Sequence, residues 1–514
     1  MKTRQIRFRP WCQPRQATHS NDVASVVMMQ MDGEPKGKTT SRSRSGCTEC
    51  KRRRVKCDET FPICTRCRKR DSICQSAPRL TKWQHEAPWI KINVHRGSSS
   101  STSFAEHHIS GITSSDDKDL LRYWLEKASQ IMVIDPDENP LSFPILEYLE
   151  QSPSLRHALQ SVGAAHRNFF DPNKLSKCLE ERSSALRLII DELACPGDNL
   201  FPLFLSVLLV GLSTAWTNSP TADFGQQHLR GARALVDSLL RDQSTGETRP
   251  PYFNLMIGAY LYWDMSMAFL IPHQSQMPLN TDEIYTAVLD VGQEYHPIGG
   301  YSTEIFYLVG NVGRYCRSVV ETGVRDEMVE AALENEMKKW EPNCDDPQLS
   351  IMSDAFRSHG LINMAAICYR RQAVDDTIRE ATQSAMLMLD AETEDDMEWW
   401  QDVWSPSIDH ELEADIRSRA LTVVRDLTAI PAHHACINLQ AIPLFTAGSE
   451  LTMEDTEERE LVQQRFRELY SLNHLRANMA ALEILPEIWE RRDAGEAISW
   501  LEVMIEKDWH IMLG

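Results

Sequence analysis

Apolar residues recur at helical spacing from Ser115 to the end of the chain. Leu120, Leu121, Trp124 and Leu125 begin this pattern, and strand-like alternation is scarce throughout the region. The pattern therefore predicts an all-α fold for residues 115–514. The helices that it predicts, apart from the one opening at Ser115, cover about residues 154–169, 174–193, 202–216, 224–241, 253–270, 302–322, 353–387, 411–429, 457–483 and 496–512.

The longest apolar run, residues 201–216, bears on membrane insertion. It has sixteen residues, whereas a transmembrane helix needs about twenty. A helix buried in the core of the helical region explains the run better. We therefore expect no membrane-spanning segment.

Residues 1–45 lack periodicity and are basic, ending in Ser41-Arg-Ser-Arg-Ser45. A disordered basic arm is predicted for them. The first residues are Arg-rich and free of acids, as in a mitochondrial targeting peptide, but Pro10 and Pro14 interrupt any amphipathic helix. Translation from Met28 or a methionine just after it is an alternative that would leave only a short arm.

Residues 77–114 are interpreted as a linker. This segment contains Pro78, Pro88 and a serine-rich run, and it has no apolar heptad pattern. These features exclude a coiled coil, which would have been one route to a dimer. A monomer, or a homodimer formed through the helical body, both remain open.

Charge divides the chain into a basic head and an acidic body. Residues 1–80 contain nineteen Lys and Arg against seven Asp and Glu, whereas the whole chain has a net charge of −20. Such a head favours contact with phosphate groups, while the acidic body is repelled by nucleic acid. The acidity of the body is equally explained by solvated helix faces.

Six cysteines between Cys47 and Cys74 have the spacing C-x2-C-x6-C-x6-C-x2-C-x6-C. The segment is two copies of one unit, which makes chance spacing implausible. Two tetrahedral zinc ions need eight metal–sulfur bonds, and six thiolates supply eight only if two of them bridge. A single zinc ion would leave two cysteines unexplained, and the absence of a secretory signal peptide argues against disulfides.

The spacing of the cysteines resembles that of the fungal zinc binuclear-cluster family of transcription regulators. The resemblance implies that Cys47 and Cys64 bridge the two zinc ions. One ion would bind Cys47, Cys50, Cys57 and Cys64, and the other Cys47, Cys64, Cys67 and Cys74. It also implies that the residues three and four positions after the second cysteine, Arg53 and Arg54, contact DNA bases in the major groove.

Arginine suits guanine because it can donate two hydrogen bonds to O6 and N7. Recognition of a CGG-type triplet is therefore expected. The neighbouring Lys51, Arg52 and Lys56 are expected to contact phosphates, which adds salt-dependent affinity. A basic run of this kind also occurs as a nuclear-localisation signal, and one segment can serve both purposes.

The helical body resembles the second type of fungal-specific transcription-factor domain. The resemblance rests on Asp119–Leu125, Leu159–His166 and His228–Val236, and on their order along the chain. It implies a regulatory region rather than a catalytic one. The predicted organisation is thus an arm (1–45), a Zn2Cys6 DNA-binding domain (46–76), a linker (77–114) and an all-α regulatory domain (115–514).

Asp390–Trp404 combines seven acidic residues with three tryptophans. Such a segment can dock on a coactivator, or it can be an inter-helix loop whose tryptophans pack on the body. His433-His434-x-Cys436 could bind a metal, but no second ligand pair accompanies it, which favours a structural loop.

Sequence motifs of common enzyme classes are absent. A helical enzyme that carries a zinc cluster, or a zinc-buffering protein, would be the alternatives to a regulator. The first lacks a convergent catalytic set, and the second needs neither the arginines nor the long body. We therefore expect a nuclear, sequence-specific regulator of RNA polymerase II transcription that binds two zinc ions, double-stranded DNA and coactivators or corepressors.

Overall fold

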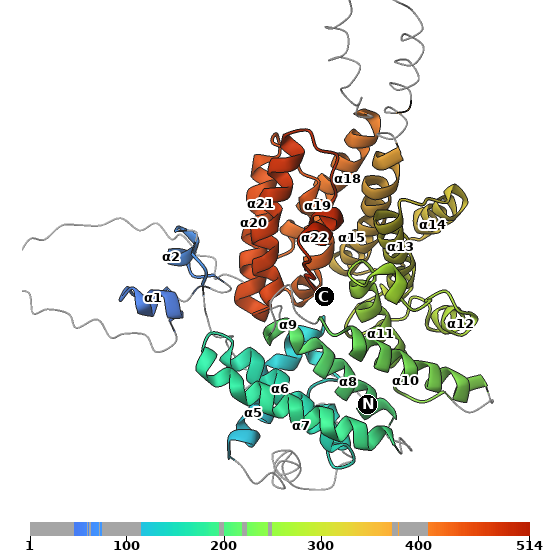
Figure 1. Cartoon of the computed structure of the whole chain (residues 1–514). Coiled ribbons are helices and arrows are strands. Elements are labelled where there is room, and N and C mark those ends of the chain that lie inside the picture. Colours follow the sequence, from blue (N-terminus) through green and yellow to red (C-terminus); the bar gives the residue numbers. More distant parts are fainter. Residues whose placement is uncertain are drawn as a thin grey trace, which may run out of the picture.

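The computed structural model describes residues 46–58, 60, 63–70, 72–74, 115–194, 200–217, 224–244, 249–372, 379 and 410–514. These residues contain helices, one isolated bridge between His296 and Gly300, and no strand (Figure 1). The all-α prediction is therefore confirmed. The predicted basic arm, the predicted linker and Asp390–Trp404 lie outside the described residues.

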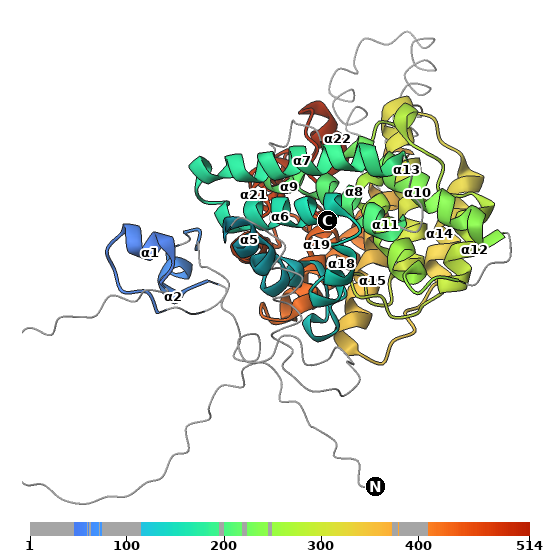
Figure 2. The ribbon, with the colours of Figure 1, turned by 90° about the horizontal axis from the view of Figure 1, so that it is seen from below.

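Two short helices, α1 (Thr48–Arg52) and α2 (Thr65–Arg68), form a small unit beside the helical body (Figures 1 and 2). They contact each other, and their shared interior consists of the six cysteines and Ile63. Because so few residues cannot bury a sizeable apolar core, this unit needs another source of stability.

The first part of the body is organised around α6, which packs against α5, α7 and α8. Figures 1 and 2 both show α6 and α7 side by side. The elements of this part are α5 (Ser115–Glu126), η1 (Ala128–Met132), η2 (Pro136–Glu138), η3 (Phe143–Tyr148), α6 (Pro153–Asn168), η4 (Pro172–Lys174), α7 (Leu175–Leu193), α8 (Leu200–Leu212) and α9 (Thr214–Thr217).

In the rest of the body, most helices pack on helices that lie near them in the sequence. Helix α11 packs on α10 and α13, and α13 packs on α15. Helix α15 packs in turn on α18 and α19. Both of these contact α20, and α19 also contacts α21. These elements are α10 (Gln226–Ser244), α11 (Phe253–Ala268), η5 (His273–Ser275), α12 (Asp282–Val291), α13 (Thr303–Thr322), α14 (Glu327–Lys339), α15 (Pro347–Met364), η6 (Ala365–Tyr369), α18 (His410–Ala429), η7 (Ala435–Leu439), α19 (Ala441–Ser449), α20 (Thr456–Asn473), α21 (Arg476–Asp493) and α22 (Trp500–Glu506).

Most of the apolar run at 201–216 forms the core helix α8, as predicted, but α8 ends at Leu212 and the last residues of the run belong to the short helix α9. Every residue of α8 from Phe201 to Gly211 is buried, so the helix is surrounded by protein on all sides. No helix within the described ranges has both the length and the hydropathy that a membrane span requires.

The single helix predicted over 457–483 was wrong. His474 adopts a left-handed conformation with φ 58° and donates its backbone N–H to the carbonyl of Tyr470, which ends α20. Its ring stacks on His166 at a centroid distance of 4.3 Å, and its Nδ1 lies 3.0 Å from the His166 carbonyl oxygen. Tertiary contacts with a residue about 300 positions away therefore compensate for the strained backbone.

A buried histidine in the turn between α12 and α13, packed against α11, is expected to make stability depend on pH. His296 Nδ1 accepts hydrogen bonds from the backbone N–H groups of Ile298 and Gly299, and burial lowers its pKa to about 4. The ordinary value is near 6.5, so the unfolded chain takes up this proton first as pH falls. The contribution of neutral His296 to the free energy of unfolding is complete above pH 6.5 and is lost progressively between pH 6.5 and pH 4.

Replacing His296 with glutamine is expected to reduce the slope of unfolding free energy against pH in this window by up to about 1.4 kcal/mol per pH unit. Denaturant unfolding at several pH values measures the slope. The matched control is His433→Gln, which removes an exposed histidine. An equal slope for the wild type and the His296 variant would contradict the assignment.

Candidate zinc and DNA-binding site

The two halves of the cysteine repeat fold in the same way. Cys47 is the N-cap of α1 and its sulfur accepts the backbone N–H of Cys50 at 3.4 Å, while Cys64 is the N-cap of α2 and accepts the N–H of Cys67 at 3.4 Å. A negative sulfur is favoured at each helix N-terminus because the N–H groups point toward it. The repeat seen in the sequence is thus a structural repeat.

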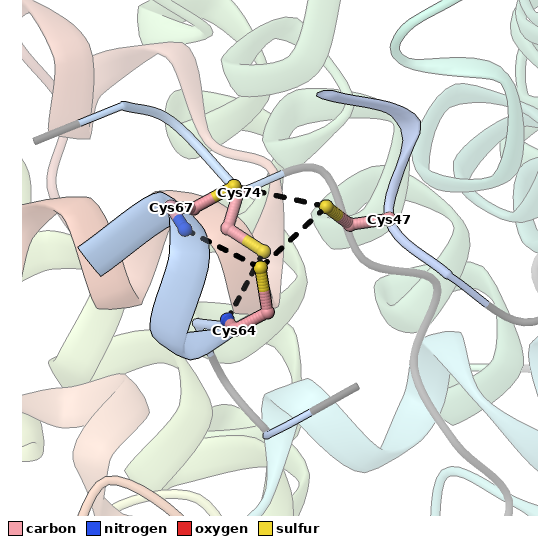
Figure 3. Close-up of side chains that lie close together, drawn as sticks. All are labelled: Cys47, Cys64, Cys67 and Cys74. Atoms are coloured by element: carbon pink, nitrogen blue, oxygen red, sulfur yellow. Dashed lines mark hydrogen bonds between the residues drawn. The ribbon is translucent and has the colours of Figure 1, made fainter. Parts of the chain in front are cut away.

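The six sulfur atoms form two groups of four that share Cys47 and Cys64. The sulfur–sulfur distances are 3.8 Å for Cys47–Cys64, 3.7 Å for Cys47–Cys67 and 3.6 Å for Cys50–Cys64. Figure 3 shows Cys47 and Cys64 facing each other, with Cys67 and Cys74 beside them. A tetrahedral zinc ion with bonds of about 2.3 Å places its sulfur ligands about 3.8 Å apart, so this geometry fits two zinc ions with two shared ligands.

Burial explains why the cluster needs cations. All six cysteines are 6% exposed or less. Burial, followed by contacts with neighbouring thiols, raises the pKa of Cys50, and burial also raises the pKa of Cys47 and Cys67. Six adjacent thiolates would repel one another, whereas two dications supply the opposing charge that stabilises them.

The predicted DNA-contacting arginines lie at the C-terminal end of α1. Arg53 is the C-cap residue, and Arg54 follows with a left-handed φ of 57°, so the chain turns away from the helix axis directly after them. Arg54 is exposed, and the side chain of Arg53 is 23% exposed. The turn therefore places two consecutive arginine residues at the C-terminal end of the helix.

Glu49 interacts with two of the basic residues of α1, a role that the sequence analysis missed. Its carboxylate accepts two hydrogen bonds from Arg52, at 2.8 and 2.9 Å, and lies 4.0 Å from Arg53 Nε. The hydrogen bonds from Arg52 are the main reason that the pKa of Glu49 is lowered. The spacing of Glu49 from both arginines, three and four positions along a helix, was the available signal. Lys51 and Lys56, which precede and follow Arg53 and Arg54 in the sequence, are both exposed.

His434 and Cys436 belong to a structural turn. His434 Nδ1 lies 2.8 Å from Cys436 Sγ and accepts the backbone N–H of Cys436 at the start of η7. Within the described ranges, the only groups of three or more potential metal ligands are the two in the head. The structure therefore favours the structural-loop interpretation.

Comparison with known families agrees with this geometry. Residues 45–84 match the fungal Zn(2)-Cys(6) binuclear cluster domain, and residues 119–514 match the fungal specific transcription factor domain. The second match covers most of the chain, so the protein belongs to the family of fungal specific transcription factors. The cluster domain is of a kind that binds two zinc ions, and the family is one of transcription factors and not of enzymes.

Several curated fungal regulators share short similar segments with the chain. They include the lysine biosynthesis regulatory protein of Saccharomyces cerevisiae (43% identity, 11% of this chain, 7% of that protein). A transcriptional regulatory protein of Schizosaccharomyces pombe is 48% identical over 12% of this chain and 13% of its own length. The aspercryptin biosynthesis cluster-specific regulator of Emericella nidulans is 44% identical over 11% of this chain and 9% of its own. The chain thus covers about a tenth of each relative, and no solved structure matches it.

Proposed function

We propose that this protein is a nuclear, sequence-specific regulator of RNA polymerase II transcription that recognises CGG-type triplets. The observation that carries the proposal is the position of Arg53 and Arg54 at the tip of a helix held by the cysteine cluster. A helix tip with two guanidinium groups fits the major groove, where guanine presents two acceptors.

The six cysteines divide between the two zinc ions in this proposal. Cys50 and Cys57 belong to the first ion, Cys67 and Cys74 to the second, and Cys47 and Cys64 bridge both. The sharing of Cys47 and Cys64 between the two sulfur groups supports this division. The zinc ions supply the fixed positive charge and the cross-links that replace an apolar core.

The basic residues around the cluster have different roles in the proposed complex. Arg53 and Arg54 contact bases. Lys51 and Lys56 contact DNA phosphates. Arg52, which Glu49 orients through two hydrogen bonds, contacts the DNA phosphate backbone near the C-terminal end of α1. Phosphate contacts add affinity that depends on salt and not on sequence.

The other parts of the chain complete the proposal. The zinc domain covers residues 46–76, the arm and linker lie on either side of it, and residues 115–514 form the regulatory domain. Coactivators or corepressors are the expected protein partners, and Asp390–Trp404 is the segment proposed to contact a coactivator. A homodimer would form through the helical body, because the linker has no coiled-coil pattern.

Selection from a random DNA library tests the proposed specificity. The purified full-length chain is incubated with the library at about 0.15 M salt, where non-specific binding is weak, and the bound DNA is sequenced. We expect enrichment of sequences that share a CGG-type triplet. Bound sequences without a common triplet would contradict the proposal.

A further inference from the structure

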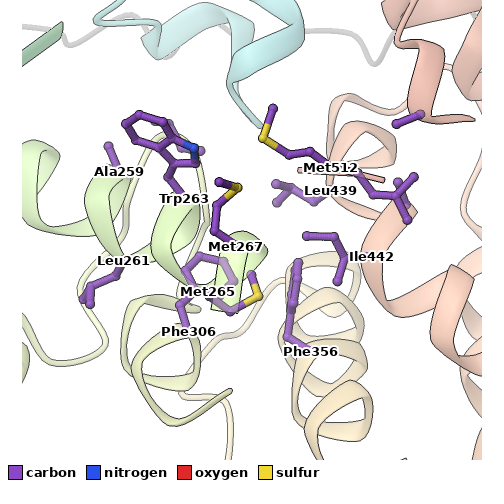
Figure 4. Close-up of a cluster of buried hydrophobic side chains, with 14 of the residues drawn as sticks. Ala259, Leu261, Trp263, Met265, Met267, Phe306, Phe356, Leu439, Ile442 and Met512 are labelled. Carbon is purple, nitrogen blue, oxygen red and sulfur yellow. The ribbon is translucent and has the colours of Figure 1, made fainter. Parts of the chain in front are cut away.

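Helix α7 carries a row of apolar side chains on the side that faces away from the body. Leu179, Ile190 and Leu193 are 50%, 69% and 46% exposed, and no other helix within the described ranges has as many large apolar side chains that are exposed. Elsewhere in the body such side chains lie inside, as Figure 4 shows for Trp263 and Phe306. Single exposed apolar residues are common, but a row of them along one helix is typical of a surface that binds another protein.

The row has the spacing of a coiled-coil helix. Leu179, Leu186 and Leu193 are seven residues apart, and Ser183 and Ile190 occupy the intervening positions of the same repeat. At about 100° per residue, these five side chains project within an arc of about 80°. Helix α7 packs on α6 and α8 through a different side, and Figure 2 shows α6 with α7 on one side and α5 on the other. The row is therefore a second apolar side of α7, which the described part of the chain leaves largely uncovered.

Two charged residues of opposite sign lie along one edge of the row. Glu180 and Arg187 each come directly after a leucine of the row, and both are exposed. They are two helical turns apart, about 10 Å along the axis, so they cannot form an ion pair within one helix. Arg187 donates a hydrogen bond to Ser184 Oγ at 3.2 Å, and a carboxylate is a stronger acceptor than this hydroxyl. The edge of the row thus offers one acid and one base to a partner.

These charges fit a second copy of α7 in the antiparallel direction. When two α7 helices lie antiparallel about a twofold axis at their middle, Ile190 of one copy lies opposite Leu179 of the other. Glu180 of each copy then lies near Arg187 of the other, so the ion pair forms twice. In a parallel pair, Arg187 of one copy would instead lie near Arg182 of the other, and like charges repel. The row and its charged edge are therefore complementary to themselves.

We propose that two copies of the chain associate through α7, with the two helices antiparallel. The helix has 19 residues and is about 28 Å long, so the contact is small for a protein interface. A dissociation constant of roughly 1–100 μM is expected for a contact of this size. The proposal rests on the homodimer in the proposed function and names its surface, whereas DNA recognition by the head is independent of it.

Sedimentation equilibrium of the full-length protein without DNA tests the proposal, at chain concentrations of about 1–100 μM. We expect a reversible equilibrium between monomer and dimer. Ile190→Glu should weaken association about 100-fold or more, because the carboxylate would be buried against apolar side chains. The side chain of Ile190 is exposed in the single chain, so circular dichroism of this variant should show wild-type helicity. The matched control is Leu289→Glu, which changes a leucine that is 57% exposed on α12 and should leave association unchanged.

Reversing the charges tests the antiparallel direction. Glu180→Arg and Arg187→Glu should each weaken association about three- to tenfold, because like charges then face each other across the interface. The double variant Glu180→Arg/Arg187→Glu should associate nearly as tightly as the wild type. This recovery must come from pairing between copies, since the two positions are too far apart to pair within one helix.

Three results would overturn the proposal. A wild type that stays monomeric would mean that the row binds a different protein or another segment of the same chain, and it would leave DNA recognition by the head untouched. A dimer that Ile190→Glu does not weaken would place the homodimer contact on another surface of the body. A double charge variant that associates no better than the single variants would contradict the antiparallel pairing.

Discussion

Cys64→Ser is expected to remove both zinc ions and to reduce specific DNA affinity about 10³-fold or more. The sulfur of Cys64 belongs to both four-cysteine groups, so its loss breaks two coordination shells at once. Structural zinc sites contribute roughly 10–16 kcal/mol to the folding of small domains, and this head has no apolar core that could compensate. The remaining affinity should be that of non-specific binding.

Metal analysis and DNA titration of the purified variant measure both effects. Cys57→Ser is the informative comparison, because Cys57 belongs to only one of the groups and should leave more zinc bound than Cys64→Ser. Cys344→Ser, a change in the body, is the control that should keep both ions. A Cys64 variant with two zinc ions and wild-type DNA affinity would show that the sulfur geometry does not represent a metal site.

The double variant Arg53→Ala/Arg54→Ala is expected to keep both zinc ions and lose the preference for CGG-type triplets. Each arginine–guanine pair contributes about 1–3 kcal/mol of discrimination, so the pair should account for about 30-fold to 10⁴-fold in specific affinity. Neither side chain lies among the buried residues of the cluster, so the fold of the head should be preserved. Binding titrations on a triplet site and on a scrambled site separate the specific part from the total.

A charge-matched control distinguishes base contacts from general electrostatics. Lys69→Ala/Arg70→Ala removes the same charge from exposed positions after α2. This control should weaken binding to both DNA sites to a similar degree and should reduce the dependence on salt. Equal losses of specificity in the two double variants would mean that Arg53 and Arg54 do not contact bases.

The head could be predicted from sequence because its structure is set by local spacing. Two copies of a three-cysteine unit leave few arrangements of eight metal–sulfur bonds, and basic residues within the pattern indicate a polyanionic partner. Glu49 escaped notice because its role depends on helical geometry within a five-residue helix. The DNA triplet itself follows from the chemistry of arginine and is untested by the structure.

The body was predictable in class but not in detail. Apolar periodicity indicated most of the helices, because a 3.6-residue period is set by packing on one side of a helix. The fully buried α8 was indicated instead by the length of its apolar run. The break at His474 was hidden because neither glycine nor proline marks it, and the ring contact with His166 that accompanies it is long-range. The close packing of Trp263 against Gly211 is likewise a contact between distant segments, which no local pattern encodes.

Genome-wide binding of the tagged native protein, compared with the Arg53→Ala/Arg54→Ala variant expressed at the same level, tests the central claim most directly. The account predicts peaks that contain CGG-type triplets for the native protein, loss of these peaks in the variant, and their retention in Lys69→Ala/Arg70→Ala at reduced occupancy. Peaks without such triplets, or triplet peaks that persist unchanged in the Arg53/Arg54 variant, would contradict it.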